Sequence, residues 1–155
     1  KKDNISNFGT YAVNSLRMEK AYRGWGAELT GEISLVEAGM DRFFNLNKKS
    51  NFIGSEILRE KLQSGVAIKI VYLELDVSDA DARGNEPVYH NNKIVGVVTS
   101  GAYGFRVNKS LAFAYVQAEL VKDETELLVE IQGQKRKAKI LNTPAYDFQN
   151  KRLKS

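Results

Sequence analysis

The chain has 155 residues, of which 43% are hydrophobic and 27% are charged, as in an ordinary soluble globular domain. A domain of this length buries roughly 68–70% of the surface that its unfolded chain exposes, so a real core is expected and disorder is excluded. With no cysteine and only one histidine, His90, the chain cannot form disulfides or thiolate metal sites and has little basis for metal or catalytic-triad chemistry.

Charge and hydropathy further limit the class of protein to which the chain can belong. No apolar run approaches the roughly 18 residues needed to span a membrane, and no apolar segment follows the basic pair Lys1 and Lys2, so neither a membrane anchor nor an export signal is expected. The net charge of +4 is densest at Lys135–Lys139 and Lys151–Lys154. Such runs suit a polyanion, but a solvated strand face explains them equally well.

The first 65 residues carry helical signals. Val13, Leu16 and Ala21 recur near helical spacing, which predicts an amphipathic helix over Gly9–Tyr22 that ends before Gly24. A short strand is expected over Glu37–Leu46. A second helix is expected over Ser55–Gln63, with Ser55 as its N-cap.

Beyond Gly65 the hydrophobic period changes from about 3.6 to about 2, which indicates strands. The expected strands are Ala67–Leu75, Lys93–Thr99, Leu111–Ala118, Glu126–Gln132 and Arg136–Leu141. The pairs Asn91-Asn92 and Gly133-Gln134 are typical of hairpin turns. The fold class is therefore α+β, with helices followed by a small antiparallel barrel or sandwich.

Two loop motifs are weighed and set aside. Asp79, Asp81 and Gly84 match part of a calcium loop, but Arg83 and His90 occupy positions that need oxygen ligands, so a solvated acidic turn is preferred. The segment from Gly101 to Ser110 resembles a phosphate loop only in part, because Asn108 stands where a glycine must precede Lys109 and no helix is expected after it. A tight loop between strands that presents Tyr103 at the edge of a cleft is the simpler interpretation.

One cluster has the composition of a ligand site. Arg17, Tyr22 and Trp25 combine aromatic rings with a cation within about two helical turns, which suits a flat heteroaromatic ligand with an acidic tail. The alternative is that both rings cover a helix end. Glu28 and Glu32 are interpreted as a solvated face, because no nucleophile accompanies them.

The segment Gly9–Thr30 resembles the block SLR-x-EK-x-Y-x-x-WG-x-[DE]-[LI]-T of dimethylglycine and sarcosine dehydrogenases. Further blocks match in the same order at Val36–Gly39, Asn51–Gly54, Asp81–Val88, Val98–Gly104 and Pro144–Asp147. The chain is thus similar to the glycine cleavage T-protein (aminomethyltransferase) family. Val13 and Arg42 stand where T-proteins have arginine and tryptophan, so the match moves away from the glycine cleavage protein. Val13, with the matches at Glu19-Lys20 and Trp25-Gly26, favours the amine dehydrogenase or oxidase branch, and a methyltransferase branch is the weaker alternative.

The resemblance implies a domain boundary near Gly65. Residues 1–65 would be the C-terminal segment of a folate-binding α/β domain, and residues 66–155 a Greek-key or jelly-roll barrel. It also implies one-carbon transfer from an N-methyl amine, such as dimethylglycine or sarcosine, to tetrahydrofolate, giving 5,10-methylenetetrahydrofolate. Tyr22, Arg17 and Tyr103 are the expected folate-binding residues, and no catalytic or metal-binding residue is expected.

The aspartate and glutamate with which this family handles folate lie upstream of the SLR block and have no counterpart in the chain. The chain is therefore expected to be part of a larger enzyme and not catalytic alone. Its expected partners are the remainder of the folate module and an FAD-bearing domain, with no membrane or nucleic acid, in the bacterial cytoplasm or the mitochondrial matrix. A non-catalytic basic barrel that binds a partner protein or nucleic acid stays the alternative.

Overall fold

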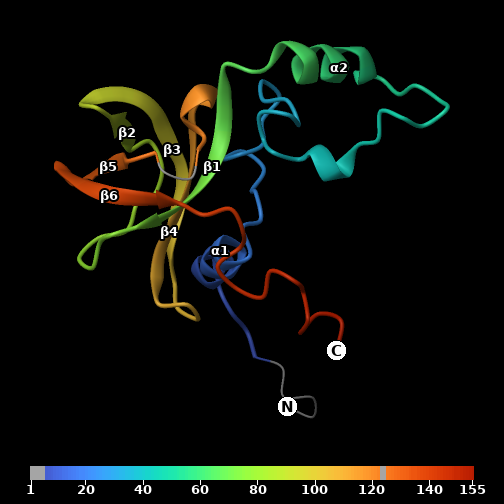
Figure 1. Ribbon diagram of the computed structural model, residues 1–155. Helices are drawn as coiled ribbons and strands as arrows, with labels where there is room; N and C mark the ends of the chain where they lie inside the picture. The colour runs from blue at the N-terminus through green and yellow to red at the C-terminus, as the bar shows by residue number, and fades with distance from the viewer. Residues whose placement is uncertain (1–5, 123–124) are drawn as a thin grey trace.

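The computed structural model describes residues 6–122 and 125–155. Two α-helices precede six strands (Figure 1). In chain order the elements are α1 (Thr10–Glu19), the 3-10 turn η1 (Asp41–Phe43), α2 (Ser55–Ser64), β1 (Ile68–Leu75), β2 (Pro87–His90), β3 (Lys93–Gly104), β4 (Lys109–Gln117), the 3-10 turn η2 (Ala118–Leu120), β5 (Leu127–Ile131) and β6 (Gln134–Ile140).

The strands form a closed antiparallel barrel in the order β1-β4-β3-β2-β5-β6. Strands β2, β3 and β4 follow one another as hairpins, and β1 lies beside β4, which is the Greek-key arrangement. Closure leaves no long free edge for another chain to pair with. The expected switch from helices to an antiparallel barrel is confirmed, and β1 begins at Ile68.

Both tight hairpins use residues with positive φ. Asn91 and Asn92 have φ of 48° and 62°, as a two-residue turn between twisted strands requires, so this expected turn is confirmed. The second turn lies one residue earlier than expected. It is formed by Gln132 and Gly133, with φ of 50° and 77°, and Gln134 already belongs to β6.

Side-chain alternation on β4 divides the core into two clusters. Ala112, Ala114 and Val116 face the inside of the barrel, with Leu73 and Val129 among their partners. The intervening side chains of β4 point outward and are covered by α1 and the segment after it. This second cluster contains Leu111, Phe113 and Tyr115 from β4, Ile70 and Tyr72 from β1, and Met18 and Ala21.

The face of helix α1 that packs on the barrel is not the face expected from Val13 and Leu16. The buried side chains are Ser15, Met18 and Glu19, and the Ser15 hydroxyl donates to the Tyr103 carbonyl at 2.7 Å. Val13 and Leu16, expected to form the buried face, are 47% and 55% exposed. The helix also ends at Glu19, so Tyr22 lies just beyond it.

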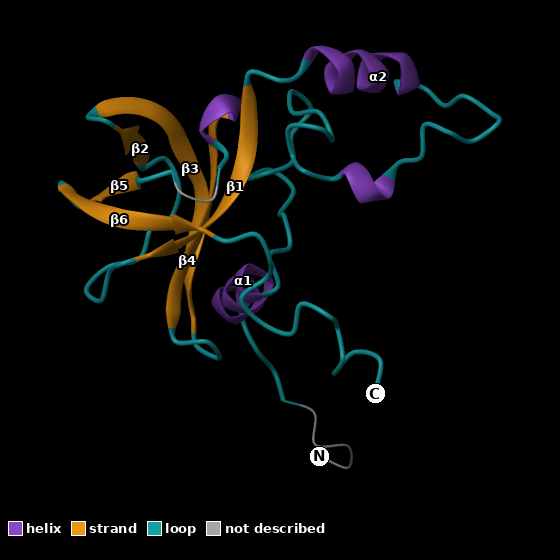
Figure 2. Cartoon of the chain, viewed as in Figure 1, coloured by secondary structure: helices purple, strands orange, loops and turns teal. Residues whose placement is uncertain are grey.

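The strand expected over Glu37–Leu46 is wrong. Residues 35–39 form turns instead, because Glu37 accepts hydrogen bonds from the Ser34 amide and hydroxyl and Gly39 has a φ of 61°. The next segment, through η1 to α2, extends away from the barrel and is mostly loop (Figure 2). Helix α2 begins at Ser55 after Gly54, whose φ is 86°, so Ser55 is not the N-cap.

The expected loop from Gly101 to Gly104 is also wrong, since these residues lie within β3. Gly101 serves close packing: a Cβ there would lie 2.4 Å from the carbonyl oxygen of Ala82. Glycine in a strand often marks such a close backbone approach as well as a turn.

Candidate functional site

Tyr22 is held at the end of α1 by a Schellman turn. Its amide donates to the Arg17 carbonyl at 2.9 Å, and the Ala21 amide donates to the Met18 carbonyl at 2.9 Å. Ala21 takes the left-handed conformation, with φ of 52°, that usually selects glycine. The turn reverses the chain and leaves the Tyr22 side chain 46% exposed, while Trp25 is 82% exposed.

The loop after Tyr22 is fixed by the buried carboxylate of Glu28. It pairs with Arg17 at 3.1 Å and accepts hydrogen bonds from the Gly24 amide and the Thr99 hydroxyl, both at 2.7 Å, and from the Ser100 hydroxyl. The sequence interpretation of Glu28 as part of a solvated face is wrong, because the residue is fully buried. A buried charge of this kind needs several partners, and Glu28 has them.

Arg17 has contacts that hold this loop together. Besides Glu28, its guanidinium donates to the Asn14 side chain at 2.8 Å and to the Tyr22 carbonyl at 3.1 Å. Arg17 therefore positions the backbone of Tyr22. A direct contact between Arg17 and a ligand stays a prediction.

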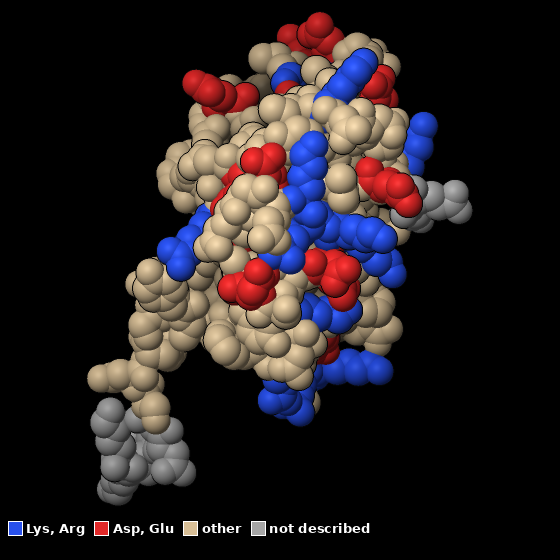
Figure 3. Space-filling model, turned by 90° about the vertical axis from the view of Figure 1, so that its left-hand side faces the viewer, with Lys and Arg blue, Asp and Glu red and all other residues tan. Residues whose placement is uncertain are grey.

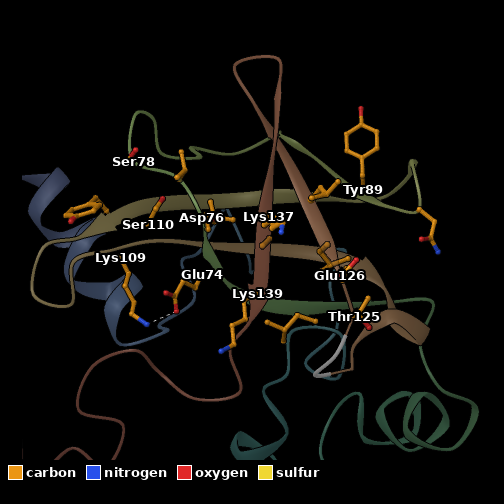
Figure 4. Close-up of a pocket in the computed structure, with 18 of the residues that line it drawn as sticks. Glu74, Asp76, Ser78, Tyr89, Lys109, Ser110, Thr125, Glu126, Lys137 and Lys139 are labelled. Carbon is orange, nitrogen blue, oxygen red and sulfur yellow. Dashed lines mark hydrogen bonds and ion pairs between the residues drawn. The ribbon is translucent and has the colours of Figure 1, made fainter.

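Tyr103 lies elsewhere. It lines a hollow of about 950 Å³ against the barrel. Glu74, Lys109 and Lys139 line the same hollow (Figure 4). Its ring packs edge-on against Phe105, with centroids 5.1 Å apart. The structure therefore brings Arg17 and Tyr22 together but places Tyr103 on a different hollow.

Tyr22 borders a second hollow, of about 400 Å³, that the sequence did not reveal. It is lined by residues 20–23, by Gly39, Asp41 and Arg42, by β1, and by residues of the segment 140–150. Four cations line it: Lys20, Arg23, Arg42 and Lys69. The spacing of these residues along the chain gives no signal, because they meet only through the turn after α1 and the start of β1.

Arg23 is a partly buried member of this group. It donates to the carbonyls of Ala38 at 3.2 Å and Ala21 at 3.0 Å, and it lies 5.4 Å above the centre of the Phe113 ring. Burial lowers the pKa of Arg23 from its ordinary value, and the nearby charge of Arg42 lowers it further. An anion in the hollow would relieve both effects.

The positive charges of strand β6 lie among acidic side chains. On the barrel face turned to the viewer in Figure 3, Lys and Arg lie interleaved with Asp and Glu. Glu130 pairs with Lys135 in the β5–β6 register, and Asp79 contacts Arg136 at 2.6 Å. A polyanion would meet alternating charges here, which weighs against a nucleic-acid surface on this strand.

The carboxylates in and beside the acidic turn at residues 79–84 form hydrogen bonds within the protein. Asp81 accepts from the Ser110 hydroxyl at 2.6 Å, and Glu86 accepts from the amides of Arg83 and Gly84, both at 2.8 Å. Within residues 6–122 and 125–155, no group of three or more acidic or histidine side chains could hold a metal ion.

No helix in this part of the chain is long and apolar enough to cross a membrane.

Comparison with known proteins defines the class of this barrel. Residues 69–147 match the glycine cleavage T-protein C-terminal barrel domain, and residues 1–48 match the GCVT N-terminal domain. The chain belongs to the glycine cleavage T-protein family. The family resemblance and the antiparallel barrel expected from the sequence are thus confirmed.

The chain spans less than half the length of the relatives that it matches. It is 42% identical over 143 residues to mitochondrial dimethylglycine dehydrogenase of Rattus norvegicus, covering 92% of this chain and 17% of that protein. It is 36% identical to an aminomethyltransferase of Synechococcus, covering 94% of this chain and 40% of that protein. The crystal structure of aminomethyltransferase T from Bartonella henselae superposes with a TM-score of 0.81 at 26% identity, covering 88% of this chain and 38% of that one.

Proposed function

We propose that the chain forms one wall of a tetrahydrofolate site in a one-carbon-transfer module. The observation that carries the proposal is the exposed ring of Tyr22 at the edge of a hollow lined by cations. An aromatic face and nearby guanidinium groups suit the flat pterin ring and acidic tail of a folate. Family membership supports this ligand, since other T-protein family members are aminomethyltransferases.

The reaction proposed for the complete enzyme is transfer of a carbon from an N-methyl amine, such as dimethylglycine or sarcosine, to tetrahydrofolate. Similarity to dimethylglycine dehydrogenase over 92% of the chain supports this donor class. An FAD-bearing domain elsewhere in the polypeptide would oxidise the amine and supply the imine carbon. The described part of this chain would contribute binding and positioning, through Tyr22 and the loop held by Arg17 and Glu28.

A partner for the exposed face of α1 belongs to the same proposal. Val13 and Leu16 lie on a helix that matches the N-terminal domain family, and both are about half exposed. Apolar side chains grouped on one face usually mark a contact surface. We assign this face to the remainder of the folate-binding domain.

We also propose a location in the bacterial cytoplasm or the mitochondrial matrix, because the relatives are a mitochondrial dimethylglycine dehydrogenase and bacterial aminomethyltransferases.

The test is product formation by the full-length protein that contains this chain. Given tetrahydrofolate, an artificial electron acceptor and dimethylglycine or sarcosine, the enzyme should form 5,10-methylenetetrahydrofolate, measured by chromatography. The same incubation without an N-methyl amine is the control and should yield none. Oxidation of the amine with no folate product, together with no binding of tetrahydrofolate, would contradict the proposal.

A further inference from the structure

The C-terminal segment, residues 142–150, lines the hollow beside Tyr22 although it forms neither helix nor strand (Figure 1). It contains the block Pro144–Asp147, one of those by which the sequence resembles the family. A segment that belongs to no helix and no strand ladder is held in place by a small number of individual contacts. The contacts of this segment therefore decide whether the hollow keeps this side.

The end of α1 provides those contacts. The Tyr146 amide donates to the Glu19 carbonyl at 2.9 Å. The Lys20 ammonium donates to the Asp147 carbonyl at 2.7 Å and to the Asn150 side chain at 2.6 Å, and it lies 3.9 Å from the Asp147 carboxylate. The Lys20 side chain is 18% exposed, so water competes weakly for these charge-assisted hydrogen bonds.

The turn that meets Lys20 has an uncommon backbone. Asp147 and Asn150 have φ of 41° and 55°, in the left-handed region that residues other than glycine seldom adopt. Within the turn, the Asp147 carboxylate accepts from the Lys151 amide at 2.8 Å, and the Asp147 carbonyl accepts from the Asn150 amide at 2.9 Å. Lys20 bonds to both left-handed residues, so it stabilises the backbone conformation that the turn requires.

The same end of α1 also places Tyr22. Glu19 and Lys20 directly precede the turn at Ala21 from which the Tyr22 ring extends. On the C-terminal segment, Phe148 lines the same hollow and is 57% exposed. Little burial fixes the Phe148 ring, so its position depends on the anchoring of the segment that carries it.

We propose that Lys20 is a positioning residue, which holds the C-terminal segment, and with it Phe148, as one side of the hollow beside Tyr22. The inference rests on the proposed function for the ligand, whereas the anchoring itself needs no ligand. Without the ammonium, the Asp147 carbonyl and the Asn150 side chain lose their donor, and the segment opens more often. A ligand held in the hollow then dissociates faster.

Hydrogen exchange of the full-length protein, followed by mass spectrometry, tests the anchoring. In Lys20→Met, amides of residues 145–150 should exchange about tenfold faster than in wild type, while those of the barrel strands stay unchanged. Lys20→Arg keeps the charge and the donors and should stay close to wild type. Lys137→Met, an equal loss of charge at an exposed position of β6, is the matched control. Equal exchange in wild type and Lys20→Met, or faster exchange throughout the barrel, would overturn the proposal.

Dissociation of tetrahydrofolate from the full-length protein, measured by stopped flow, tests the consequence for the site. Lys20→Met and Phe148→Ala should each raise the dissociation rate constant about fivefold or more. Ile94→Ala is the matched control, because Ile94 is a similarly exposed apolar residue on β3, and it should leave the rate constant unchanged. Unchanged dissociation in both variants would overturn the proposal. A wild type that binds no tetrahydrofolate would contradict the proposed function instead, and the exchange of residues 145–150 would still decide whether Lys20 anchors the segment.

Discussion

Glu28 is the residue on which the loop carrying Tyr22 depends most directly. Its carboxylate joins α1, through Arg17, to β3, through Thr99 and Ser100, with no exposure to solvent. Replacing one member of a buried, hydrogen-bonded ion pair typically costs about 3–5 kcal/mol. The charge of Glu28 is thus a structural requirement of the site.

Glu28→Gln should therefore lower the free energy of unfolding by about 3 kcal/mol or more, measured by urea denaturation. Glu32→Gln is the matched control, because Glu32 is exposed four residues away and should change stability by no more than about 0.5 kcal/mol. Equal small effects of the two substitutions would show that the buried network contributes little.

Two buried tyrosines give the fold a dependence on alkaline pH. Burial raises the pKa of Tyr72 and of Tyr115 to about 12, and their hydroxyls donate to the carbonyls of Met18 and Glu28. In the unfolded chain both phenols lose their protons near pH 10, so the unfolded state binds fewer protons between pH 10 and 12. Stability should be fully present below pH 10 and should fall as the pH rises toward 12.

Urea denaturation at pH 9, 10, 11 and 12 measures this fall. Tyr72→Phe should flatten the decline relative to wild type, because one of the two groups no longer titrates, although the variant loses the hydrogen bond to Met18 at every pH. A decline of the same steepness in both proteins would mean that lysine titration, common to both, is the cause.

At the scale of elements, β3 depends on glycines that permit close backbone contacts. Gly101→Ala would place a Cβ 2.4 Å from the Ala82 carbonyl oxygen, and backbone cannot yield as a flexible side chain can. We expect a loss of about 1–3 kcal/mol in the free energy of unfolding. Gly31→Ala, with open space around the new Cβ, is the control and should be near neutral.

The sequence predicted the elements whose signals are local and missed those set by tertiary contacts. The period of 2 after Gly65 and the Asn91-Asn92 turn have local causes, and both are confirmed. The role of Gly101 depends on Ala82, far along the chain, and the burial of Glu28 depends on Thr99 and Ser100. The spacing of residues along the sequence does not indicate such contacts.

The residues of the candidate site also differ in how far the sequence predicted them. Tyr22 lies at the edge of a hollow, and its role in ligand binding, expected from a motif, stays a prediction. Tyr103 was placed in an interstrand loop, but it lies in β3 and faces another hollow. Arg23, Arg42 and Lys69 carried no signal, because only the folded chain brings them together.

At the scale of the whole molecule, the exposed apolar face of α1 should behave differently in the chain and in the full-length protein. Leu16→Lys should leave the melting temperature of the 155-residue chain nearly unchanged, since Leu16 is 55% exposed. In the full-length protein it should destabilise by about 2 kcal/mol or more, because the side chain would be buried against the rest of the domain.

Ile94→Lys is the matched control for this comparison, since Ile94 is 64% exposed on β3, away from α1. It should be silent in both proteins. If Leu16→Lys is equally silent in both, the face of α1 is not a contact surface with the remainder of the domain.

Binding of tetrahydrofolate through Tyr22 tests the central claim most directly. Calorimetric titration of tetrahydrofolate into full-length wild type and Tyr22→Ala should show a loss of more than about 1.5 kcal/mol in binding free energy, because both an aromatic contact and its apolar burial are removed. Thermal melts of the two proteins should nearly coincide, since the side chain is 46% exposed. Unchanged affinity together with a large drop in melting temperature would contradict the account and leave Tyr22 as a residue that covers the end of α1.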